Sequence, residues 1–188
     1  MYSFFLVSLV LAAGLAFLAG SFHLLPRHSA LREKMPTWPR KPILPGCVIG
    51  VVALIWSAYH GCLMLEGPLE KLHLYVWILV PVSTILCILY LDYLNARAFG
   101  GFVTLAANFL IAQAFIHNIP CRGFYSSICL LIGVAGLVAI GLPWRIRDWF
   151  TIASKNSTIA RISAMALAAI VILLVAFPSV WMLLKPKN

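Results

Sequence analysis

The sequence predicts an all-α membrane protein: a bundle of six transmembrane helices that follow one another as an antiparallel meander with short loops. Composition is the first reason, because 63% of the 188 residues are hydrophobic and only 10% are charged, whereas soluble domains average about 45–50% and about 25%. Length is the second, because six apolar stretches approach the roughly 20 residues that cross a bilayer. Third, none of the six contains Lys, Arg, Asp or Glu, and none alternates apolar and polar residues as a transmembrane β-strand does.

The predicted spans form a single transmembrane domain over residues 1–188. The first lacks basic residues at its start, unlike a signal peptide, so we expect a retained helix. The second to fifth are joined by short connections, which favour antiparallel neighbours. Two connections are longer: Pro26–Pro45 holds five prolines, which exclude a long helix, and Pro143–Arg161 is basic and polar. The spans are Tyr2–Leu25, Gly46–Leu65, Leu74–Leu91, Phe102–His117, Phe124–Leu142 and Ile162–Leu184.

Lys and Arg are distributed unevenly over the connections. With six spans, the first, third and fifth connections share one side and carry ten of these residues, against four on the other side. Because cations gather on the cytoplasmic side, the sequence predicts that both termini lie outside the cytoplasm, in a bacterial-type inner membrane. The net charge of +9 is then explained by contact with the lipid bilayer. We expect no nucleic acid partner.

Three of the five histidines are predicted to lie near the outer side. His60 lies five residues before the end of the second span, His73 precedes the third and His117 ends the fourth. A neutral imidazole in a membrane can ligate haem iron or hydrogen-bond a quinone. One hypothesis is therefore a b-type haem or quinol site held by His60 and His117, with His73, Gln113 and Tyr59 beside it. The alternative is that His60 bonds across helices and the other two are interfacial residues.

Enzyme signatures are absent from the sequence. It contains no glycine-rich phosphate loop, serine-centred elbow or zinc-binding helix pattern. No span contains a carboxylate, which argues against a carrier or protease that depends on a buried acid. We therefore expect no catalytic activity of the chain's own. Cys62 and Cys121 both fall near the predicted outer face, where a disulfide is chemically permitted, and the sequence leaves their state open.

Small residues recur at four-residue spacing in three of the spans, which lets helix backbones approach closely. The sequence does not distinguish internal packing from contact with another chain. Pro81 and Pro178 interrupt two spans, so that a backbone carbonyl in each loses its partner. The small residues are Ala12, Ala16 and Gly20, then Gly46 and Gly50, then Ala135 and Ala139.

These patterns predict a non-catalytic integral membrane subunit of a larger membrane protein complex. Two alternatives stay open: an electron-transfer subunit that binds haem b or quinol through His60 and His117, and a component of a small-solute transporter. A transporter predicts a polar cavity near Ser83, Asn108 and Gln113. In length and number of spans the chain resembles the substrate-binding subunits of vitamin importers, and no site residue follows from that resemblance.

Overall fold

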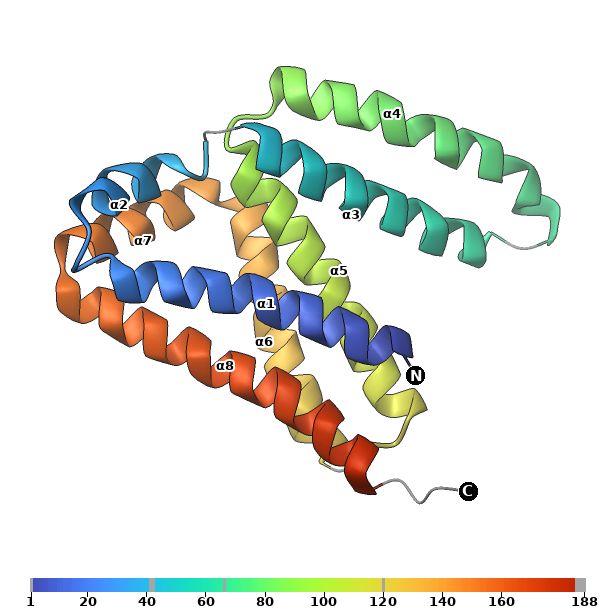
Figure 1. Ribbon diagram of the computed structural model, residues 1–188. Helices are drawn as coiled ribbons and strands as arrows, with labels where there is room; N and C mark the ends of the chain where they lie inside the picture. The colour runs from blue at the N-terminus through green and yellow to red at the C-terminus, as the bar shows by residue number, and fades with distance from the viewer. Residues whose placement is uncertain (1, 41–42, 66, 120, 185–188) are drawn as a thin grey trace.

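The computed structural model describes residues 2–40, 43–65, 67–119 and 121–184 (Figure 1). These residues form eight α-helices and two short 3-10 helices, without a strand. Six of the helices are long and apolar enough to cross a membrane, which confirms the predicted all-α bundle. Their backbone groups bond within each helix, as an apolar solvent requires. The six are α1 (Tyr2–Leu24), α3 (Ile43–Met64), α4 (His73–Tyr90), α5 (Leu94–Ile116), α6 (Arg122–Gly141) and α8 (Ser157–Leu184).

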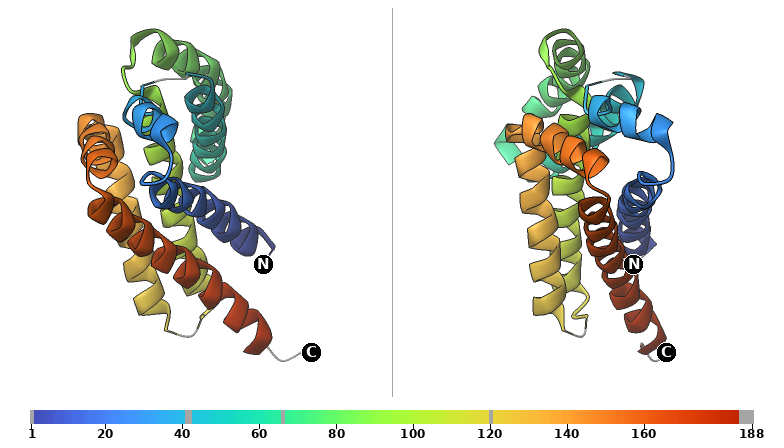
Figure 2. Two further views of the ribbon diagram at one scale, coloured as in Figure 1. Left: turned by 60° about the vertical axis from the view of Figure 1, so that its left-hand side comes forward. Right: turned by 90° about the vertical axis from the view of Figure 1, so that its left-hand side faces the viewer.

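The spanning helices form three antiparallel pairs, α1 with α8, α3 with α4, and α5 with α6 (Figures 1 and 2). Helix α5 joins the pairs, because it packs against α1, α3 and α6. The predicted meander is correct for α3 with α4 and for α5 with α6. It is wrong between α4 and α5, because α3 packs against both and α4 makes its main contacts with α3 and the short η2 (Gly67–Leu72).

Glycines set the closest approach, between α5 and α6. A Cβ on Gly100 would lie 2.6 Å from the carbonyl oxygen of Gly136, and a Cβ on Gly136 would lie 2.8 Å from that of Gly100. Both distances are shorter than any real contact, so the two backbones touch only because both residues lack a side chain. The hydroxyl of Thr104 donates to the Gly100 carbonyl at 2.9 Å and lies 3.4 Å from that of Gly133.

Helices α3 and α5 are close at one end and wedged apart at the other. At the close end, a Cβ on Gly46 would lie 2.9 Å from the backbone nitrogen of Asn95. Toward the far end, the indole of Trp56 stands between the helices, with its ring centroid 5.8 Å from those of both Phe102 and Phe109. The α3–α4 pair therefore diverges from α5 along its length, as Figure 1 shows. The Gly46–Gly50 pair thus serves internal packing.

A proline links α1 to α8. Pro178 lies inside α8 and has no N–H to donate to the carbonyl of Leu174, four residues earlier. The buried hydroxyl of Ser8, on α1, donates to that carbonyl at 2.6 Å. The carbonyl that Pro178 frees is therefore bonded across the helix pair.

We predict that Ser8→Ala lowers the free energy of unfolding in detergent by about 0.6–1.7 kcal/mol, the usual range for hydrogen bonds between membrane helices. Ser179→Ala is the matched control, because the Ser179 hydroxyl bonds only within α8, to the Val175 carbonyl at 2.7 Å. The loss should shrink in a Pro178→Ala background, where the backbone N–H bonds the Leu174 carbonyl. An equal loss in both backgrounds would contradict the explanation.

Candidate functional site

The first, third and fifth connections meet at one end of the bundle, as the sequence predicts. We call this the basic end; it comprises α2 (Ser29–Lys34), η1 (Met35–Thr37), the turn before α5, and α7 (Pro143–Lys155). Direct contacts join the three connections: Arg40 donates to Asp92 at 3.3 Å, and Arg147 donates to the hydroxyl of Tyr93 at 3.1 Å. Helices α7 and η1 also pack together.

Helix α7 is not among the predicted elements, because Pro143–Arg161 is basic and polar in composition and was expected to be a connection. Pro143 begins the helix, where its missing N–H costs no hydrogen bond. Apolar residues recur at three- and four-residue spacing, the pattern of an amphipathic helix. They bury against α1, α8 and η1, in a cluster that closes the basic end. Its buried members are Phe22, Leu25, Met35, Phe150, Ala153, Ala160 and Ala164.

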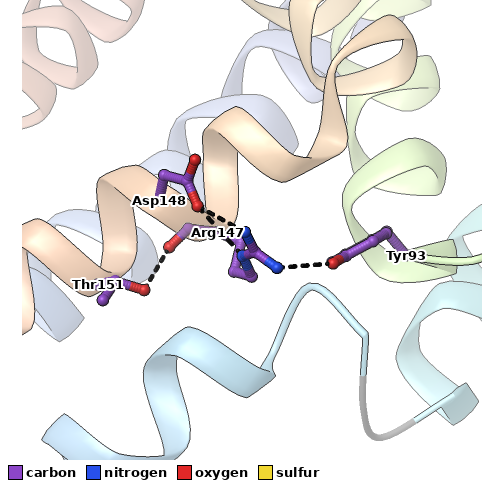
Figure 3. Close-up of polar contacts among 4 residues, drawn as sticks. All are labelled: Tyr93, Arg147, Asp148 and Thr151. Atoms are coloured by element: carbon purple, nitrogen blue, oxygen red, sulfur yellow. Dashed lines mark hydrogen bonds and ion pairs between the residues drawn. The ribbon is translucent and has the colours of Figure 1, made fainter.

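Tyr93 lies among charged residues of the basic end, and Figure 3 shows its hydroxyl bonded to Arg147. Its backbone adopts the left-handed conformation, with φ 60°, directly before α5. Its hydroxyl accepts from Arg147, which also donates to Asp148 at 2.8 Å. The guanidinium of Arg40 lies 5.9 Å from the centre of the Tyr93 ring. A strained bulky residue that contacts two arginines is a candidate functional position.

The electrostatics of the basic end favour contact with anions. The hydrogen bond to Asp148 raises the pKa of Arg147, as does the nearby Tyr93, so this side chain stays charged at any physiological pH. Arg40, Tyr93 and Arg147 line an open hollow of about 540 Å³. Both arginines already have carboxylate partners, Asp92 and Asp148, so the hollow itself is largely neutralised. The other cations of this end suit a negatively charged membrane surface.

His60 and His117 lie near the end opposite the basic end, as predicted, but have different neighbours. The His60 ring lies near the rings of Trp56, Tyr59 and Phe109, at centroid distances of 6.2, 5.5 and 6.3 Å. The His117 ring packs near Phe4 of α1, at 6.0 Å. Phe109 precedes His117 by eight residues on one helix, which is about 12 Å along its axis. The described contacts therefore do not bring the two imidazoles to one iron.

The remaining candidate residues occupy ordinary positions. His73 Nε2 bonds the carbonyl oxygen of Leu65 at 2.8 Å and so closes the turn between α3 and α4. Tyr59 is 54% exposed, and Gln113 is half-buried one turn before His117. No group of three or more His, Cys, Asp or Glu side chains within the described ranges could hold a metal ion, and all five cysteines are free. The haem or quinol site stays a prediction without support from these contacts.

Comparison with family models, with curated proteins and with solved structures yields no match.

We predict that single cysteines at Ser29 and Ser157, introduced into a chain without its native cysteines, react with a membrane-impermeant thiol reagent from the same side. A cysteine at Leu69, in η2, should react from the other side. All three residues are exposed and uncharged, so the substitutions leave the charge bias of the connections intact. Labelling of Ser29→Cys and Ser157→Cys from opposite sides would contradict the six-span topology.

We also predict that His60→Phe retains the fold and changes the free energy of unfolding by less than about 1.5 kcal/mol, because an aromatic ring of similar volume keeps the contacts with three neighbouring rings. Trp56→Ala, which removes the wedge between α3 and α5, should cost more. The haem hypothesis makes the opposite prediction. A b-type band in the reduced-minus-oxidised spectrum that disappears in His60→Phe would restore it.

Proposed function

We propose that the protein is a non-catalytic integral membrane subunit that joins another helical membrane protein through its α3–α4 pair. The proposal places the basic end in the cytoplasm and both termini outside it, in a bacterial-type inner membrane. The observation that carries it is the isolation of α4. No residue in the most apolar 18-residue window of this helix is buried, whereas up to 33% are buried in other spanning helices.

A spanning helix without buried residues indicates a missing neighbour, because of the way membrane helices associate. Lipid tails are as apolar as the helix surface, so membrane helices associate through close packing and hydrogen bonds rather than through the hydrophobic effect. Among the described spanning helices, α4 packs closely against α3 alone, and α3 itself diverges from α5 toward the end opposite the basic end (Figure 1). A helix from another chain against α4 would add the packing that this chain does not provide.

The transporter alternative receives less support. Its predicted polar cavity requires Ser83, Asn108 and Gln113 to face one space. Asn108 is exposed on the surface of α5, while Ser83 lies on α4, which does not pack closely against α5. The described positions therefore do not bring Ser83 and Asn108 to one polar cavity.

We predict that native mass spectrometry of the protein, extracted in mild detergent, shows an assembly with a second membrane protein at fixed stoichiometry. Leu79→Trp should disrupt that assembly, because Leu79 is 60% exposed on α4. Ile172→Trp is the matched control, with 65% exposure on α8. Both variants should melt at the wild-type temperature when the partner is absent.

A protein that runs as a single chain in mild detergent would overturn this proposal. An assembly made only of copies of this chain would replace the foreign partner by a homo-oligomer. Equal disruption by Leu79→Trp and Ile172→Trp would show that α4 is not the contact.

A further inference from the structure

Arg97 differs from every other cation that the structure describes. It is the fourth residue of α5, one turn inside the basic end, and it is half-buried, whereas the other described Lys and Arg side chains are exposed. Its Nε atom is buried without a hydrogen-bond partner, and within the described ranges no carboxylate lies within ion-pair distance of it. Burying part of a guanidinium in this way is costly unless an anion compensates.

The space in front of Arg97 is an apolar crevice between α3, α4 and α5, with a volume of about 280 Å³. On α3 its lining extends from Gly46 to Leu54, and along α4 it extends from Leu91, directly after the helix, back to Thr84. Eight and seven residues of helix correspond to about 12 and about 10 Å. The crevice therefore runs from the basic end toward the middle of the membrane, with the single charged group at its start.

We propose that this crevice binds one anionic phospholipid, with the phosphate at Arg97 and an acyl chain along α3, α4 and α5. Charge complementarity selects the occupant, because an unpaired guanidinium bonds phosphate oxygens through its planar fork. The apolar walls select a lipid over free phosphate, which would lose its hydration there without apolar contacts in return. The depth of Arg97 also fits contact with a lipid phosphate, because the residue lies about 5 Å inside the start of α5.

Two other spaces are weaker candidates for a lipid. A cavity of about 290 Å³ between α1, α5, α6, α7 and α8 has no charged lining residue, so nothing in it would fix a headgroup. The hollow at Tyr93 has two arginines, but each already bonds a carboxylate. Of these three spaces, the α3–α4–α5 crevice is the one that combines a half-buried, unpaired cation with a deep apolar wall.

Lipid binding to the full chain in a lipid-free detergent tests the proposal. Native mass spectrometry would compare phosphatidylglycerol with phosphatidylcholine of the same acyl chains. For the wild type we expect at least about tenfold tighter binding of phosphatidylglycerol, because both lipids carry a phosphate but the quaternary ammonium of phosphatidylcholine offsets that charge and repels Arg97. Arg97→Gln should abolish this preference. Arg161→Gln is the matched control, because Arg161 is an exposed cation in the first turns of α8 and loses the same charge.

A second variant tests the acyl-chain half of the site. Gly101 lines the crevice, and nothing lies within 4 Å of a Cβ placed on it, so a side chain can begin there and Gly101→Leu extends it into the crevice. Binding of both lipids at this site should then fall. The melting temperature without lipid should be unchanged in Gly101→Leu and unchanged or higher in Arg97→Gln, since an uncompensated charge is removed.

Three outcomes would overturn the proposal: equal wild-type affinity for the two lipids, equal loss of preference in Arg97→Gln and Arg161→Gln, or displacement of phosphatidylglycerol by inorganic phosphate at comparable concentration. If Arg97→Gln does not fold, Arg97→Lys replaces it in the test of lipid preference. It keeps the charge but loses the fork, so we expect an intermediate preference.

Discussion

The fold depends on the close approach of backbones around α5. In lipid, helices gain nothing from leaving the solvent, so their association relies on contacts that only small residues permit. Gly100 and Gly136 bring α5 against α6, and Gly46 brings α3 against the start of α5. Because α5 also packs against α1, the three helix pairs have one common element. A side chain at Gly136 would therefore disturb more than the α5–α6 contact.

The two ends of the bundle are built differently, and the difference follows from the connections. The basic end has the two long connections, which fold into α2, η1 and α7 and bury an aromatic cluster over α1 and α8. The opposite end has short turns, one of them closed by the bond between His73 and the Leu65 carbonyl. Helix α3 can therefore diverge from α5 there, with Trp56 as the wedge. Sites for lipid and for partners are expected where helices separate, at the crevice and along α4.

Much of this could be predicted from the sequence, since a bilayer makes length and hydropathy decisive. The six spans, the shared side of the basic connections and the position of His60, His73 and His117 toward the opposite end follow from those rules. Which helices pack against one another does not follow from those rules. Gly46 and the Trp56 wedge are specific packing features, and the lengths of the loops do not reveal them. Helix α7 was recognisable from Pro143 and the apolar spacing after it. That His60 and His117 have different neighbours could not be predicted, because a similar predicted depth in a membrane does not imply contact.

The turn at Tyr93 explains why a cation lies inside the crevice. A left-handed residue with a side chain costs about 1–2 kcal/mol, so other contacts must hold it. Here the ring lies beside Arg40 and the hydroxyl accepts from Arg147, which ties the turn to both long connections. Helix α5 consequently begins at Leu94, eight residues before the uncharged stretch at Phe102. That early start places Arg97 one turn into the bundle, beside α3 and α4. In an exposed loop the same residue would lie in water. The conformation of one tyrosine thus determines the environment of the one half-buried cation among the described residues.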